Sequence, residues 1–381
     1  MSGYRSLHRE TLGKYPIWSL AASATLKKKS SATNASNDWR IFAACGDGIV
    51  RGYLVGEKSL EEKGDTLDAS ACTLTVTTLF LGKEQTVPPE SEEEPMVLGC
   101  TQVEVARNYV GDDDSAGDLL VASMDLAGRV RIWQISEDAD GESSSSSSNE
   151  KTTLKALQEF DVEQATGTCM RIVAPKIAGV GDVCVAVARL DGTVACIATG
   201  LVTPKATKDP KPAGSILETW GKPGSIAMSL AWHPSKKFLA IGRQDGLVEY
   251  LEDKPHRLIM HHTPVRALSF TPDSYLLVTG SDEGMIAIWD TSRPNPALVH
   301  HVMDAHNGSW ILSLAVMLDS RRFVTGSVDS TLNVWNVGQI DRAMHTFSSD
   351  GAVWSSSVLQ DPPRLVAGNN KGGLQIYSLE P

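Results

Sequence analysis

Residues 323–336 read FVTGSVDSTLNVWN, and residues 276–290 read LLVTGSDEGMIAIWD. Each stretch consists of an apolar run, a short turn containing Asp and Ser or Gly, and a second run that carries a tryptophan close to its end. This order predicts two β-strands joined by a tight turn, which is a β-hairpin. Because the two stretches match along their length, they indicate an internal repeat.

The same unit recurs along the whole chain. Five further hairpins follow this order, at residues 41–53, 119–133, 183–197, 238–250 and 365–377. An additional apolar strand precedes the hairpins, and one connecting strand completes a repeat of four strands. The last four repeats close on residues that lie 39, 46 and 42 positions apart, namely Tyr250, Trp289, Trp335 and Tyr377. This period is typical of propeller blades, and longer spacings earlier in the chain coincide with polar inserts.

Seven such sheets favour a closed ring. A lone four-stranded sheet leaves its faces and edges exposed, whereas radially arranged sheets cover one another. We therefore expect an all-β fold, a single seven-bladed β-propeller over residues 1–381. The last repeat ends with its third strand, at residues 374–377. We expect residues 4–13, ahead of the first inner strand at residues 17–21, to supply the missing outer strand and close the ring.

Composition narrows the class of protein. The chain has 381 residues, a formal net charge of −11 and 41% hydrophobic residues. The acidic balance argues against DNA or RNA binding as the main role. The six cysteines form no C-x-x-C pair and are interpreted as small buried apolar residues in a reducing compartment. With no signal segment and no run of 18 apolar residues, we expect a cytoplasmic and nuclear protein without a membrane association.

Four polar inserts are expected to be flexible loops, since they contain too few apolar residues to fold alone. They lie near residues 24–38, 82–95, 136–152 and 202–213. The third contains six consecutive serines, Ser143 to Ser148. A solvated spacer is one interpretation of this run, and a site of regulated phosphorylation is the other.

The hairpins resemble those of WD-repeat (WD40) propellers over about residues 4–380, although only Trp289-Asp290 keeps the literal Trp-Asp pair. Within that class, five segments resemble the WD-repeat subunits of superkiller (Ski) complexes, a type shared in animals with the RNA polymerase II-associated factor (Paf) complex. They are IWSLA at 17–21, PVRALSFTPDS at 264–274, SWILSLA at 309–315, VWNVG at 334–338 and Val353-Trp354.

The resemblance implies a non-catalytic protein-interaction scaffold in cytoplasmic 3′-to-5′ mRNA decay with the exosome. Its partners would be a tetratricopeptide-repeat scaffold protein and an RNA helicase, with a nuclear role beside Paf complex subunits as a further implication. The propeller would be monomeric within such hetero-complexes. Alternative interpretations are a substrate receptor of a ubiquitin ligase, a signalling β-subunit, or an enzyme with its site assembled across blades.

Seven residues are candidates for a protein-binding top surface. They lie at or beside the starts of inner strands, or just before the hairpin turns: Trp18, Arg189, Met228, Arg243, Arg266, Trp310 and Trp354. Tryptophan offers a large contact area at low conformational cost, and arginine adds a cation. We expect a mixed apolar and cationic surface for a peptide carrying an aromatic group and an acidic or carbonyl group. The alternatives are tryptophans packed between blades and arginines solvated at the rim.

The repeated turn acids are interpreted as structural, because Asp in a tight turn bonds its own backbone. They are Asp47, Asp191, Asp245, Asp282 and Asp329. By the resemblance, blade six alone retains a buried network, formed by His306, Asp329, Trp335 and a hydroxyl of Thr325 or Ser327. The chain contains no G-x-x-x-x-G-K-[ST], H-E-x-x-H or G-x-S-x-G motif. We therefore expect no catalytic, cofactor-binding or metal-binding residues.

Overall fold

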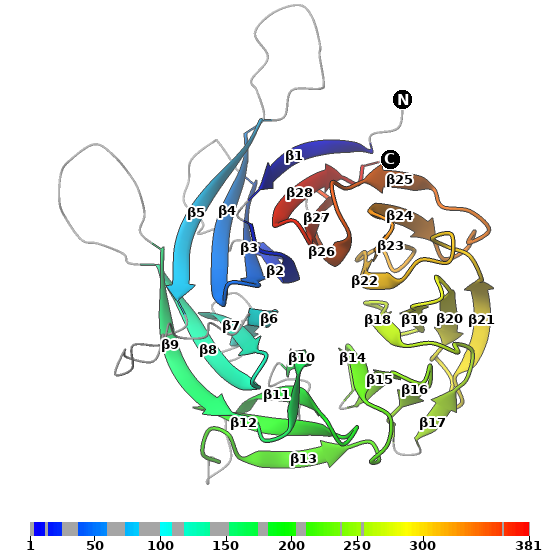
Figure 1. Ribbon diagram of the computed structural model, residues 1–381, viewed down its shortest axis with the longest axis horizontal. Helices are drawn as coiled ribbons and strands as arrows, with labels where there is room; N and C mark the ends of the chain where they lie inside the picture. Colours follow the sequence, from blue (N-terminus) through cyan, green and yellow to red (C-terminus); the bar gives the residue numbers. More distant parts are fainter. Residues whose placement is uncertain are drawn as a thin grey trace, which may run out of the picture.

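The computed structural model describes residues 4–11, 14–24, 37–58, 73–83, 100–108, 118–137, 152–173, 182–202, 211–236, 238–252, 255–359 and 362–380. These residues contain 28 β-strands and no helix, arranged as seven four-stranded antiparallel sheets around an axis (Figure 1). The predicted all-β, seven-bladed propeller is therefore confirmed.

Each blade runs from an inner strand beside the axis to an outer strand at the rim (Figure 1). The inner strands are β2 (Ile17–Ala24), β6 (Cys100–Asn108), β10 (Ala165–Val173), β14 (Ala227–Trp232), β18 (Val265–Phe270), β22 (Ile311–Val316) and β26 (Val353–Leu359). The second strands are β3 (Asn37–Cys45), β7 (Asp118–Asp125), β11 (Asp182–Arg189), β15 (Leu239–Arg243), β19 (Leu276–Ser281), β23 (Arg322–Ser327) and β27 (Arg364–Asn369). The third strands are β4 (Ile49–Lys58), β8 (Arg129–Glu137), β12 (Val194–Val202), β16 (Val248–Tyr250), β20 (Ile286–Asp290), β24 (Thr331–Asn336) and β28 (Gly373–Ser378). The outer strands are β5 (Thr73–Lys83), β9 (Thr152–Asp161), β13 (Ile216–Trp220), β17 (His256–Leu258), β21 (Ala297–Val302), β25 (His345–Ser348) and β1 (Arg5–Thr11).

The ring is closed by the first strand of the chain. Strand β1 pairs antiparallel with β28, with Arg5 opposite Ser378 and Thr11 opposite Gly373, so blade seven combines both ends of the described chain. The inner strand β26 of that blade also contacts β2 of blade one (Figure 1). The expected closing strand is confirmed, and its described part is residues 5–11.

The hydrophobic core lies between neighbouring blades. One cluster joins Ile17, Trp39 and Tyr53 of blade one to Val366 and Ile376 of blade seven. Burying apolar surface is worth about 25 cal/mol per Å². A blade separated from its neighbours loses this contribution on both faces, so the blades depend on one another for stability.

One predicted closing residue needs correction. Trp289, Trp335 and Tyr377 pair with Leu277, Phe323 and Leu365, and each faces the preceding blade. In blade four this position belongs to Leu251, whose amide donates to Leu239 O. Tyr250 comes one residue earlier and packs toward blade five, because successive side chains of a strand point to opposite faces.

The hairpin turns share one backbone conformation. A residue with positive φ stands at the same point of each turn: Gly48, Gly128, Gly192, Gly246, Gly284, Ser330 and Gly372. Glycine suits this left-handed conformation because it has no Cβ, and Ser330 is the exception. In four turns the preceding aspartate accepts a hydrogen bond from the amide two residues on: Asp47, Asp191, Asp245 and Asp329. This is the structural role expected of these acids.

Four outer strands contain one extra residue at equivalent points of the ladder. These residues, all aliphatic, are Leu79, Leu157, Leu217 and Val299. Leu157 and Leu217 pack against blade cores, whereas Val299 is 46% exposed. Such bulges twist an unpaired edge and disfavour its pairing with another sheet.

The predicted loops at 24–38, 82–95, 136–152 and 202–213 fall mainly outside the described residues, and the Ser143–Ser148 run lies entirely outside them. Cys45, Cys100, Cys169, Cys184 and Cys196 are buried, as expected, whereas Cys72 lies outside. None of the described segments forms a helix with the length and apolar character required to cross a membrane.

Removal of residues 1–11 should open the ring. The truncated chain loses the β1–β28 ladder, and each lost hydrogen bond costs about 1 kcal/mol. We expect a loss of roughly 3–6 kcal/mol in the free energy of unfolding, together with self-association through the exposed edge of β28. Urea denaturation and light scattering measure the two effects. Arg9→Ala is the control, since it removes only exposed side-chain contacts, with Asp350, Ser348 and Ser6, and should cost less than about 1 kcal/mol.

Candidate functional site

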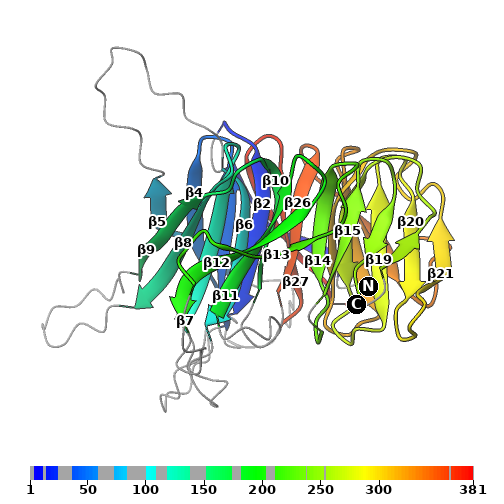
Figure 2. The same ribbon diagram turned by 90° about the horizontal axis from the view of Figure 1, so that it is seen from below.

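The top face of the propeller is the end that carries the hairpin turns and the connections from each outer strand to the next inner strand. In Figure 2 this end is seen from the side, with the strands running between it and the opposite end. The residue two positions before the positive-φ residue of each turn belongs to this face, and three large apolar residues at this position are exposed: Leu126 by 52%, Leu190 by 57% and Val328 by 42%. Trp310, at the end of the connection into β22, is 47% exposed.

Three tryptophans line one pocket on this face. Trp18 is the second residue of β2 and Trp354 is the second residue of β26. Their rings meet edge-on, with 4.7 Å between the ring centroids. The pocket has a volume of about 630 Å³. Its lining consists of Pro16, Trp18, Gly308, Ser309, Trp310, Val328, Ala352, Trp354 and Asn370. We call this site the tryptophan pocket; it is built by blades one, six and seven and is mostly apolar in its residue types.

A fixed cation lies beside the tryptophan pocket. Arg266 of β18 places its guanidinium carbon 5.0 Å from the centroid of the Trp310 ring, a cation–π distance. Its Nε donates to Asp282 at 2.7 Å. Burial raises the pKa of Asp282, and the bond from Arg266 opposes that shift. Arg266 therefore places a cation beside Trp310 at the edge of the tryptophan pocket.

Asp282 does not have the turn role predicted for it. The residue at the turn position of blade five is Glu283, whose Oε1 accepts from Ser281 Oγ at 3.2 Å and from the His262 amide at 3.1 Å. Asp282, one residue earlier, is directed at Arg266 instead. A one-residue offset within the turn is invisible when only the Asp-to-Gly spacing is compared.

Three further candidates lie outside the tryptophan pocket. Met228 lines the central channel, a cavity of about 380 Å³ that Trp18, Arg266 and Trp354 also line and that contains the Glu104–Arg171 ion pair. Burial raises the pKa of Glu104, and Arg171 opposes that shift. Arg189 lies at the hairpin turn of blade three, where Nη2 is 3.5 Å from Gln164 Oε1. Neither Met228 nor Arg189 is brought to the tryptophan pocket.

Arg243 is a core residue and not part of the top surface, because only 2% of it is exposed. Its guanidinium donates to Gly192 O at 2.9 Å, to Ser225 O, and to Glu249 Oε2 at 2.6 Å. It thereby joins the hairpin turn of blade three and the connection into blade four to the third strand of blade four. Both predicted roles, partner contact and solvated rim, are wrong for this arginine.

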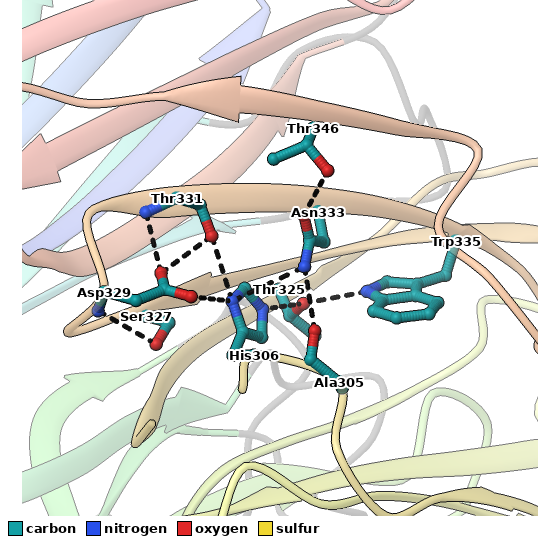
Figure 3. Close-up of polar contacts among 9 residues, drawn as sticks. All are labelled: Ala305, His306, Thr325, Ser327, Asp329, Thr331, Asn333, Trp335 and Thr346. Carbon is teal, nitrogen blue, oxygen red and sulfur yellow. Dashed lines mark hydrogen bonds and ion pairs between the residues drawn. The ribbon is translucent and has the colours of Figure 1, made fainter. Parts of the chain in front are cut away.

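A buried hydrogen-bond network holds blade six together (Figure 3). His306 Nδ1 lies 3.0 Å from Asp329 Oδ2, and its Nε2 lies 2.7 Å from Thr325 Oγ1. Trp335 Nε1 donates to the same Thr325 oxygen at 2.9 Å. Of the two hydroxyls considered from the sequence, Thr325 joins the histidine and Ser327 instead accepts from the Asp329 amide.

Blade five contains a second version of this network, so the prediction that blade six alone has one is wrong. His261 Nε2 lies 2.7 Å from Thr279 Oγ1, which also accepts from Trp289 Nε1 at 3.3 Å. Glu283 stands where blade six has aspartate, and its Oε1 is 3.7 Å from His261 Nδ1. This network was missed in the sequence because Glu283 replaces the aspartate and because His261 was not considered as its histidine.

Pro16, Val328, Ala352 and Asn370 of the pocket lining were not predicted. Val328 and Asn370 occupy the position before the turn acid, or its equivalent, which alignment of the seven hairpins assigns to the top face. Within the described ranges no group of three or more His, Cys, Asp or Glu side chains is placed to hold a metal ion. The tryptophan pocket is a concave site lined mainly by aromatic and aliphatic residues.

A family model for the WD domain, G-beta repeat, matches residues 253–290 and 298–336. SIR4-interacting protein SIF2 of Saccharomyces cerevisiae is 22% identical over 41% of this chain and 29% of its own length. Pre-mRNA-processing factor 19 of Oryza sativa subsp. japonica is 27% identical over 40% and 29%. Human striatin is 24% identical over 40% and 23%. The chain thus covers less than a third of each of these relatives.

Arg243→Ala should strongly destabilise the protein, because it leaves the partly buried Glu249 without its cationic partner. We expect the free energy of unfolding to fall by about 3–5 kcal/mol. Arg189→Ala is the matched control at the equivalent position of the neighbouring blade, and should change it by less than about 1 kcal/mol. Urea denaturation of both variants measures the difference. Equal effects would contradict the buried role of Arg243.

Acid should destabilise the protein through two buried histidines. Burial lowers the pKa of His261 and of His233 to about 4, from an ordinary value near 6.5. Because the unfolded chain binds these protons first, stability present above pH 6.5 is lost as the pH falls toward 4. Each histidine contributes a slope of up to about 1.4 kcal/mol per pH unit.

Urea denaturation of the wild type and of His233→Gln/His261→Gln between pH 7.5 and 5 measures this slope. Lys236 and Glu252 act on His233, and Glu283 and His262 act on His261, so these four residues are kept in both proteins. The double variant should show a smaller loss of stability on acidification. An identical pH dependence of the two proteins would refute the assignment.

Proposed function

We propose that this chain, a seven-bladed β-propeller that carries WD40 repeats, is a non-catalytic scaffold that binds a partner protein through its top face. The observation that carries the proposal is the tryptophan pocket, where half-exposed Trp310 stands over an apolar cavity beside Arg266. A half-exposed tryptophan at a concave site, with an arginine beside it, combines two of the residue types that dominate binding energy at protein interfaces.

The pocket suits one side chain of an extended segment. Its volume of about 630 Å³ exceeds that of any single residue, so an aromatic or large aliphatic side chain and part of its backbone fit inside. Arg266 adds a cation for a carboxylate or carbonyl group of the same segment, although Asp282 already neutralises part of its charge. The proposed ligand is therefore an extended peptide with an apolar anchor flanked by an acidic or carbonyl group.

The finer proposal is a Ski-complex-like subunit that acts in cytoplasmic 3′-to-5′ mRNA decay, with a nuclear role in a Paf-like transcription elongation complex. It is supported by the resemblance of residues 17–21, 264–274 and 309–315, which supply Trp18, Arg266 and Trp310 to the top face. The partners would be a tetratricopeptide-repeat protein and an RNA helicase. The relatives found here differ in name from one another, so a ubiquitin-ligase receptor or signalling subunit is the competing proposal.

Trp310→Ala should abolish partner capture and leave the fold intact, since the side chain is 47% exposed. We expect at least a tenfold loss of the captured partner, equivalent to about 1.4 kcal/mol. Affinity purification with mass spectrometry measures the loss and names the partners. Tyr275→Ala is the matched control, because Tyr275 is 60% exposed on the turn after β18, at the opposite end of the ring.

Each outcome of the purification decides something. Helicase and tetratricopeptide-repeat proteins that disappear with Trp310→Ala support the Ski-like proposal. Cullin adaptors or G-protein subunits lost in the same way would replace it. A partner set unaffected by Trp310→Ala would remove the tryptophan pocket as the docking site.

A further inference from the structure

We propose that the buried network of blade six positions the tryptophan pocket: the contact between His306 and Asp329 fixes the backbone of Trp310 and Val328, and so sets the affinity of the top face for its ligand. This inference rests on the proposed function and assigns a second task to residues otherwise regarded as purely structural.

His306 is anchored on both ring nitrogens. It is 1% exposed, and its bonds to Asp329 and Thr325 are those in Figure 3. Thr325 Oγ1 already accepts the proton of Trp335 Nε1, so its own proton is free to be donated to His306 Nε2. His306 Nδ1 then carries the ring proton and donates it to Asp329. This polarity fixes the tautomer and the orientation of the ring.

The chain from His306 to Trp310 is short and tightly turned. Ser309 N donates to His306 O at 2.9 Å, which closes the turn. Asn307 and Gly308 have φ values of 50° and 72°, so both adopt the left-handed conformation. Asparagine and glycine are the residues that adopt this conformation most readily, so they suit a tight turn between His306 and Trp310. His306 is the fixed end, and Trp310 is the end exposed to the ligand.

A second lining residue of the pocket, Val328, is tied to the same contact. Val328 N donates to Trp310 O at 3.1 Å, so the two lining residues are joined directly. The next residue is Asp329, whose Oδ1 accepts from the amide of Thr331 at 2.8 Å and from its hydroxyl at 2.7 Å. The hydrogen bond between His306 and Asp329 therefore joins the two segments: Asp329 directly follows Val328, and His306 begins the turn that leads to Trp310.

Asp329→Asn tests the positioning role with little change in shape. The amide oxygen can still accept from Thr331, but the amide NH₂ would face the protonated Nδ1 of His306, which opposes donor to donor. Trp133→Phe is the matched control in blade two, across the ring in Figure 1, where it removes the 2.9 Å bond from Trp133 Nε1 to Ser123 Oγ. Both variants lose one buried hydrogen bond, and only the first touches the pocket.

The readout is fluorine NMR of the full chain labelled with 5-fluorotryptophan, with the Trp310 resonance assigned from Trp310→Phe. We expect Asp329→Asn to move this resonance and Trp133→Phe to leave it in place. The binding probe is the blocked pentapeptide acetyl-Gly-Gly-Phe-Gly-Gly-amide. We expect it to bind Asp329→Asn at least fivefold more weakly than the wild type, and Trp133→Phe within twofold of it. Melting temperatures show whether the two variants are comparably destabilised.

The outcomes separate the two proposals. If the Trp310 resonance does not move in Asp329→Asn, the positioning role is overturned. The same conclusion follows if both variants lose peptide affinity in proportion to their loss of melting temperature. If the Trp310 resonance of the wild-type protein does not shift when the peptide is added, the proposed function of the pocket is wrong. In that case the movement of Trp310 in Asp329→Asn still decides the positioning role. If Asp329→Asn does not fold, His306→Gln replaces it under the same criteria.

Discussion

The pairing of β1 with β28 is the constraint on which the rest of the molecule depends. Each blade buries its two faces only against its neighbours, so an open arc would expose the faces of both end blades. Seven residues near the start of the described chain remove that problem by completing the last sheet. The hydrogen bonds of this ladder therefore stabilise every inter-blade core, including cores far from the seam.

The same closure creates the candidate binding site. Trp18 belongs to blade one and Trp354 to blade seven, so their contact at 4.7 Å spans the seam between the first and last blades. Blade six then contributes Trp310 and Val328 to the far wall. An intact ring is thus a precondition for the tryptophan pocket, which links the stability of the fold to its proposed function.

The hairpin turns show how one backbone geometry tolerates different chemistry. Where the turn acid is missing, Asp125 and Asn369 supply the acceptor from a position two residues earlier. Blades five and six have a serine at that earlier position, Ser281 and Ser327. Blade four has Arg243 there, and its guanidinium bonds to carbonyl groups of blade three and of the connection into blade four. In these blades a side chain at this position bonds to backbone groups, although the type of residue differs from blade to blade.

The sequence by itself determined the repeat, the strand order within a blade, the number of blades and the strand that closes the ring. These follow from local patterns: apolar alternation, turn residues and a final repeat that is one strand short. It also indicated Trp18, Trp310, Trp354 and Arg266 as residues of one end of the ring, because each lies near the start of an inner strand.

Only the tertiary structure decided which candidates meet. Arg243 and Arg189 occupy equivalent positions in the sequence, yet Glu249 and the carbonyls of blade three draw the first into the core. Asp282 does not have the predicted turn role, because it lies one residue before the turn position and pairs with Arg266. Burial, ion pairing and contact across the seam depend on residues distant in the chain, and a local pattern carries no information about those neighbours.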